Sequence, residues 1–148
     1  MSLALSFPGG HLKTVEIPAT AGNVVTTISP GVGVRWIIQY GEVNIDSDGN
    51  AGNRKFVIEI TDGTDTVLHL GDNDNAITAN QKGVVIIMNP QGMQDWTMGT
   101  PGFNVTSTLP ISGLLLEGAD ELQIEINNGL AGDSYEGFIR VLALGITP

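Results

Sequence analysis

The residues of this chain that could bind a metal ion gather in one acidic segment. Asp46, Asp48 and Asn50 alternate with a serine and a glycine, and alternate oxygen ligands can converge on a hard cation such as calcium. The segment departs from an EF-hand loop, because Ala51 occupies the position of the required glycine and Val57 that of the bidentate glutamate. We therefore treat these residues as a weak calcium candidate. The pattern favours a solvated turn with no bound metal and no cofactor.

Groups that could carry out catalysis are few and isolated. The chain has no cysteine, and its two histidines, His11 and His69, lie outside any recognisable ligand or triad spacing. No serine lies in a nucleophile elbow, and no glycine-rich phosphate loop occurs. Glu121 and Glu125 could act as a pair on a sugar, but their alternation on one side of a predicted strand is what solvation alone would produce. We predict that the protein is not an enzyme and has no small-molecule substrate.

Composition and charge limit the partners that the protein can bind. The chain has 148 residues, a length that suits one domain with one core, and 41% of them are hydrophobic. It carries 6 Lys and Arg against 16 Asp and Glu, a net charge of −10 that disfavours binding to a phosphate backbone. Its apolar runs are shorter than the roughly 20 residues of a membrane helix. We expect no nucleic acid partner and no membrane insertion.

Short apolar and alternating segments, separated by Gly, Pro, Asn and Asp, predict about eight strands and no long helix. The expected strands cover residues 12–17, 23–29, 34–45, 54–61, 66–70, 83–89, 121–127 and 135–146. Strands at intervals of roughly 8–12 residues are typical of a β-sandwich or barrel. We therefore predict an all-β, single-domain antiparallel β-sandwich that resembles a jelly roll.

Two of these segments organise the expected fold. Residues 34–45 and 54–61 flank a loop of Asp, Ser, Gly and Asn, which predicts a large antiparallel hairpin at the centre of the domain. In the first segment Trp36, Ile38 and Tyr40 are expected on one face, and Gly41 marks a bulge or bend. Pro18 is expected to end the first strand.

Two segments are candidates for contacts with other subunits. Residues 1–10 form an expected flexible arm, followed by a domain of residues 11–148, and the arm's alternating Leu3, Leu5 and Phe7 could add a strand to a neighbouring chain. Residues 93–110 lack a clear period and contain a set of large apolar side chains: Met93, Trp96, Met98 and Phe103. Such a segment either folds back on the core or is presented to a partner.

The order of strands and a few local steps resemble a family of virion proteins. The matching features are Arg35-Trp36, Asn53-Arg54, the turn at Glu117-Gly118-Ala119-Asp120-Glu121 and the turn at Gly132-Asp133. Over most of residues 11–147 the chain resembles the small jelly-roll virion proteins of tailed bacteriophages. The resemblance implies a capsid decoration, or cement, protein that binds the outer surface of the capsid and stabilises it. It further implies the major capsid protein as partner, a homotrimeric state and a location on the exterior of the virion.

A carbohydrate-binding or receptor-binding β-sandwich module is the alternative. Such modules bind sugars with exposed aromatic side chains and often hold a structural calcium. Trp96 is the candidate platform for stacking on a sugar, whereas Trp36 is expected in the core.

Overall fold

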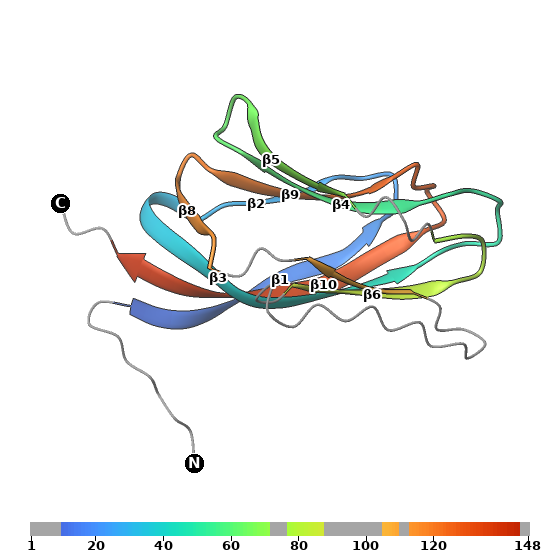
Figure 1. Ribbon diagram of the computed structural model, residues 1–148, viewed down its shortest axis with the longest axis horizontal. Coiled ribbons are helices and arrows are strands. Elements are labelled where there is room, and N and C mark those ends of the chain that lie inside the picture. Colours follow the sequence, from blue (N-terminus) through green and yellow to red (C-terminus); the bar gives the residue numbers. More distant parts are fainter. Residues whose placement is uncertain (1–9, 72–76, 88–104, 110–112, 146–148) are drawn as a thin grey trace, which may run out of the picture.

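The computed structural model describes residues 10–71, 77–87, 105–109 and 113–145 (Figure 1). Every regular element in these ranges is a β-strand, so the predicted all-β class is confirmed. The strands are β1 (Gly10–Ala21), β2 (Thr26–Ile28), β3 (Gly31–Asp46), β4 (Lys55–Thr61), β5 (Thr66–Gly71), β6 (Lys82–Ile87), β7 (Val105–Leu109), β8 (Leu115–Gly118), β9 (Glu121–Asn127) and β10 (Ser134–Gly145).

The strands form two sheets that pack face to face as a sandwich (Figure 1). Sheet A has the order β1-β10-β3-β6-β7. Its strand β8 pairs with the first part of β3, and β6 pairs with the last part of β3. Sheet B has the order β2-β9-β4-β5. The termini of the described chain meet at one end, because the first residue of β1, Gly10, is paired with Leu144 of β10.

The pairing of the strands is that of a jelly roll. The chain doubles back on itself, so that β1 pairs with β10, β2 with β9, β3 with β6 and β4 with β5. The doubled ribbon then rolls up, which adds the pairs of β10 with β3 and of β9 with β4. This nesting uses eight strands, as in other double-sheet jelly rolls. Strands β7 and β8 are additions to the connection between β6 and β9.

The predicted central hairpin of residues 34–45 and 54–61 is wrong. Both segments are strands, β3 and β4, but β3 lies in sheet A and β4 in sheet B, so they face each other across the core. A loop of Asp, Ser, Gly and Asn can turn the chain back within a sheet or carry it to the opposite sheet, and the local residues are the same in both cases. The next connection does turn back within one sheet, because β4 pairs antiparallel with β5 in sheet B.

The core lies between the two sheets and is filled by alternate side chains of each strand. On β9 the inward residues Leu122, Ile124 and Ile126 are buried, and the residues between them are partly exposed. Trp36 is buried as expected. In most strands, the alternation of apolar and polar residues in the sequence therefore predicts which face of the strand packs against the opposite sheet.

A bulge in β3 changes which residues face the core. Arg140 is paired with Tyr40 and Val141 with Ile38, so Gln39 is the extra residue on β3. Before the bulge Trp36 and Ile38 are buried. After the bulge the buried residues are Gly41, Val43 and Ile45. Tyr40 therefore lies on the outer face of sheet A, and its predicted place beside Trp36 and Ile38 is wrong.

Gly41 occupies an inward position with little room for a side chain. A Cβ atom there would lie 3.0 Å from the Phe138 carbonyl oxygen, 3.1 Å from Ile87 Cδ1 and 3.2 Å from Ile139 Cγ1. The bend predicted near Gly41 is thus the bulge two residues earlier, and the glycine allows β3, β10 and β6 to pack closely after it.

Pro18 does not end the first strand. The register shifts between Ile17, which is paired with Gly137, and Thr20, which is paired with Tyr135. Because β1 is an edge strand, the missing N–H of Pro18 is tolerated at a bulge, and the strand continues to Ala21.

The segment of residues 93–110, for which the sequence shows no clear period, is described only at residues 105–109, which form a strand. Its last part, β7, pairs in parallel with β6, whereas the other strand pairs of the described residues are antiparallel. The sequence Val-Thr-Ser-Thr-Leu has no alternation of apolar and polar side chains, so its pattern did not predict a strand here.

Candidate functional site

The outer face of sheet A carries a row of exposed apolar side chains at one end. Leu12 of β1 is paired with Leu142 of β10, Leu142 with Ile37 of β3, and Ile37 with Leu115 of β8. Leu12 is 57% exposed and Leu115 47% exposed, and the two residues between them are partly exposed. Directly paired side chains touch, so these four form a continuous strip across four strands, here called the apolar row.

The apolar row lies where the described chain begins and ends. Leu12 is two residues from Gly10, and Leu142 is three residues from Gly145, the last described residue. An ion pair borders the row, with Arg35 Nε 2.5 Å from Glu117 Oε2 and both side chains nearly half exposed. The row is therefore an accessible apolar strip with a charged border on one side.

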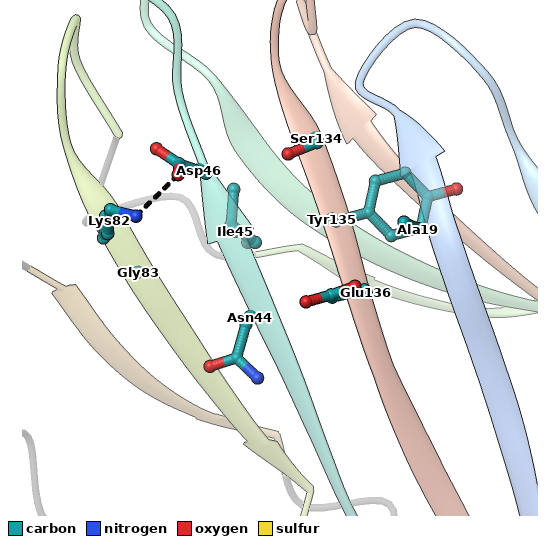
Figure 2. A pocket seen from close by; sticks show the side chains of 9 residues that line it. All are labelled: Ala19, Asn44, Ile45, Asp46, Lys82, Gly83, Ser134, Tyr135 and Glu136. Carbon is teal, nitrogen blue, oxygen red and sulfur yellow. Dashed lines mark ion pairs between the residues drawn. The ribbon is translucent and has the colours of Figure 1, made fainter.

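At the opposite end of the same face, the sheet is hollowed. A hollow of about 280 Å³ is lined by polar side chains of three strands: Asn44, Asp46, Lys82, Ser134 and Glu136 (Figure 2). A second hollow of about 330 Å³ adjoins it, shares Ala19, Asn44 and Glu136 with it, and adds Glu16, Pro18 and Phe138. The two hollows together are called the groove.

The bulge in β1 and the small side chain of Ala19 explain why the face is hollow there. Two residues of β1, Pro18 and Ala19, oppose one residue of β10 between Ile17 and Thr20. A bulge of this kind bends an edge strand and increases its twist.

The side chains of the groove have a regular spacing set by the strand register. Asn44 is directly opposite Glu136, and Asp46 is directly opposite Ser134. The corners of this rectangle are about 5 Å apart across the strands and about 7 Å apart along them. Figure 2 shows Lys82 reaching from β6 to Asp46, and its Nζ lies 2.7 Å from Asp46 Oδ2.

The groove carries more negative than positive charge. Glu16, Asp46 and Glu136 contribute three carboxylates, and Lys82 contributes one ammonium group. Among the described residues, no hydrogen bond or ion pair engages the carboxylates of Glu16 and Glu136. The groove therefore offers acceptors that are free to bind a ligand.

Aromatic side chains border the groove on the side of the apolar row. The rings of Tyr40 and Phe138 have their centroids 5.9 Å apart, and Arg140 lies over the Phe138 ring at 5.9 Å. Burial, together with the charge of Glu42 and a hydrogen bond to it, raises the pKa of Tyr40 above its ordinary value. Tyr40 is therefore a protonated hydroxyl donor at neutral pH.

A buried cluster of charges, here called the Arg54 cluster, holds the turns at the groove end of the sandwich. The Arg54 side chain is fully buried, and its Nε donates to Asp133 Oδ2 at 2.7 Å. Its Nη2 donates to Asp48 Oδ1 at 2.6 Å and to the Asn50 carbonyl at 3.0 Å. The guanidinium thus joins the turn between β3 and β4 to the turn between β9 and β10.

Asp133 accepts hydrogen bonds from several turns, and its carboxyl group is ionised because of them. Its carboxylate accepts hydrogen bonds from the backbone N–H groups of Asp48 and Leu130, and its carbonyl accepts one from Gly22. Burial by itself would raise the pKa of Asp133, but the hydrogen bonds from Arg54, Leu130 and Asp48 and the charge of Arg54 outweigh it and lower the pKa below the ordinary value. The carboxylate is a structural anion rather than a proton donor.

The structure separates the residues of the calcium candidate. Asp48 belongs to the Arg54 cluster, where Asn50 also donates to it, with 2.7 Å between Asn50 Nδ2 and Asp48 Oδ2. Asp46 points to the outer face of sheet A and pairs with Lys82. Within the described ranges, no group of three His, Asp or Glu side chains is arranged to hold a metal ion. Asp46 and Asp48 are thus each paired with a basic side chain.

All of the predicted contact residues lie outside the described residues. This applies to Leu3, Leu5 and Phe7 of the arm and to Met93, Trp96, Met98 and Phe103. His69, by contrast, is placed as a half-exposed side chain on the outer face of sheet B, with Nδ1 2.6 Å from Glu59 Oε1.

Sequence reasoning missed both the Arg54 cluster and the apolar row. Arg54 and Asp133 are 79 positions apart, and each lies in a turn rich in Gly and Asn. The fold brings the two turns so close that a Cβ atom on Gly132 would collide with the Asp48 carboxylate, but the sequence around Gly132 gives no sign of this contact. The row requires the register of four strands, which the alternation of single strands does not contain.

Comparisons with models of protein families, with curated proteins and with solved structures found no match for this chain. The part of the chain that the structure describes contains no helix with the length and apolar character to cross a bilayer.

Proposed function

We propose that this protein is a structural component of a virus particle, a decoration protein that binds the outer surface of the capsid and stabilises it through subunit contacts. The single observation that supports this most is the apolar row on the outer face of sheet A. Contiguous exposed apolar strips on a small protein mark sites of association, whereas single exposed side chains do not. The partner in this proposal is the major capsid protein, together with further copies of this chain in a homotrimer.

The shape of the row suits association with a protein surface. Its four side chains come from four strands of one sheet, so they present a flat strip that needs no rearrangement on binding. The Arg35–Glu117 pair beside it provides the polar border that is usual around an apolar contact. Contacts of modest strength become strong when many copies bind one particle.

The rest of the domain suits a rigid accessory subunit. The jelly roll is an architecture used by capsid proteins, although a fold alone does not assign a function. The Arg54 cluster ties together turns that would otherwise move independently. A decoration protein must hold its contact surfaces in fixed relative positions to connect neighbouring capsid subunits.

The test is co-sedimentation with capsids of the encoding virus that were purified without this protein. The double variant Leu12→Ser/Leu115→Ser removes the exposed ends of the row, and Val67→Ser, at a 60% exposed position of sheet B, is the matched control. We expect the wild type and Val67→Ser to bind alike and the double variant to bind at least about tenfold more weakly. Equal binding of the double variant, or no binding of the wild type, would reject the proposal.

A carbohydrate-binding or receptor-binding module is the second candidate, and the groove favours it. The groove and the apolar row lie at opposite ends of the outer face of sheet A, separated along β10 by the residues between Glu136 and Leu142. A protein that attaches by the row would leave the groove free, so one molecule can have both functions.

A further inference from the structure

We propose that the groove on sheet A is a binding site for a neutral saccharide. This inference depends only on the groove and holds whether or not the protein decorates a capsid. It begins from the rectangle formed by Asn44, Glu136, Asp46 and Ser134, whose corners the register of β3 and β10 fixes. Its sides of about 5 and 7 Å match the scale of one sugar ring with its hydroxyl groups.

The polar groups of the groove are those that bind sugar hydroxyls. A hydroxyl group both donates and accepts a hydrogen bond, so a site for several hydroxyls needs acceptors and donors side by side. The Glu136 carboxylate is a free acceptor, the Asn44 amide offers both kinds of group, and Lys82 supplies a donor beside Asp46 (Figure 2). The Ser134 hydroxyl can take either role.

The second hollow supplies an apolar wall for the C–H face of a sugar. Pro18 and Ala19, at the bulge of β1, and the Phe138 ring line it beside Glu16. Ligand sites usually combine apolar walls with a small number of placed polar groups, and the combined groove has both. The two adjoining hollows therefore suit two linked sugar units, one in each.

The charge of the groove selects among saccharides. Three carboxylates face one ammonium group, and that ammonium is already paired with Asp46 at 2.7 Å. A sialic acid, uronic acid, sulfate or phosphate group would meet Glu136 or Glu16 at close range, and like charges disfavour binding. The groove consequently favours sugars without an anionic group.

The test is a titration of the full-length, isotope-labelled protein, followed by NMR shifts of its backbone amides. The probes are lactose, maltose and chitobiose as neutral disaccharides, sialyllactose as the anionic counterpart and a short lysine-rich peptide. We expect shifts at residues 44–46, 82–83 and 134–138 with at least one neutral disaccharide at up to about 10 mM, and far smaller shifts with sialyllactose.

Variants then test the polar contacts. Glu136→Gln and Asn44→Ala should each weaken saccharide binding by about tenfold. Glu125→Gln makes the same chemical change as Glu136→Gln but on the outer face of sheet B, and it should leave binding unchanged. The melting temperature of each variant separates a loss of binding from a loss of fold.

Three results would overturn the proposal. The first is no shift in the groove with any of the neutral probes. The second is binding that Glu136→Gln and Asn44→Ala leave intact in folded protein. The third is a response of the groove to the lysine-rich peptide alone, which would assign it to a basic segment of a partner protein.

Discussion

Arg54 shows how one side chain can fix several turns at once. Its guanidinium is fully buried, and its partners are two carboxylates and the carbonyl groups of Asn50 and Gly52. A buried charge is costly unless it is paired and hydrogen-bonded, and here the pairing is nearly complete. The turns are therefore held by an arrangement that fails if any one charge is removed.

Replacing Arg54 should destabilise the domain strongly. In Arg54→Met the carboxylate of Asp133 loses its cation while it stays buried, so we expect the free energy of unfolding to fall by about 3–5 kcal/mol. The double variant Arg54→Met/Asp133→Asn should lose less than the sum of the two single variants, because position 133 then carries no buried charge without a partner. Urea denaturation of the three variants measures these values.

The matched control is the exposed pair of Lys82 and Asp46, whose side chains are more than half exposed. Lys82→Met should change the free energy of unfolding by no more than about 1 kcal/mol. If Lys82→Met lowered the free energy of unfolding as much as Arg54→Met, burial would not be the reason that the Arg54 cluster stabilises the domain.

The lowered pKa of Asp133 makes the free energy of unfolding depend on pH. Its pKa in the folded protein is lowered, chiefly because hydrogen bonds and the charge of Arg54 outweigh the effect of burial. A lowered pKa stabilises the fold above the unfolded value of about 3.9, and this stabilisation disappears as the pH falls through the folded value. We expect the difference in urea midpoint between the wild type and Asp133→Asn to be large at neutral pH and to shrink as the pH falls below about 4. A constant difference over that range would contradict the assignment.

At the level of the strands, the alternation of apolar side chains predicted most of the elements. The predicted strand of residues 121–127 has the same bounds as β9, and the final predicted strand differs from β10 by one residue at each end. Alternation works for these strands because one side faces the core and the other faces water. It cannot tell which strands are neighbours, and for this reason β3 and β4 were wrongly paired.

The bulge at Gln39 shows why a local pattern can place a side chain on the wrong face. A single extra residue moves every later side chain of a strand to the other face, so Tyr40 lies outside and Gly41 inside. The same shift places Asn44 and Asp46 in the groove. The candidate site was therefore not predictable without the register.

Gly41→Ala tests the close packing that follows the bulge. The added methyl group would lie 3.0 to 3.2 Å from three atoms of β10 and β6, two of them in the core residues Ile87 and Ile139. Overpacking of this kind should lower the free energy of unfolding by about 1–3 kcal/mol. Chemical denaturation measures the change, and a variant as stable as the wild type would show that the strands at this point separate easily.

Across the whole molecule, the two ends of sheet A have different chemistry. The apolar row lies at the end where the described chain begins and ends, and the groove lies at the other end, beside the turns that the Arg54 cluster holds. We infer a molecule that attaches to other subunits by one end and presents a polar groove at the other. This division gives the proposed subunit contacts and the proposed saccharide site separate surfaces.

Of the arm predicted at residues 1–10, the structure describes only Gly10, which is the first residue of β1 and lies at the end of sheet A that carries the apolar row. In the proposed homotrimer, the apolar row forms the contact between copies of the chain.

The central claim is that the apolar row mediates association, and the mass of the protein in solution tests it most directly. Light scattering at several concentrations, with and without calcium, should give about 46 kDa for the wild type, three times the 15.5 kDa of the chain. Calcium should not change this mass. Leu12→Ser/Leu115→Ser should shift the protein to the monomer, and Val67→Ser should remain trimeric. A wild type that is monomeric at every concentration, or a double variant that still forms trimers, would contradict the account.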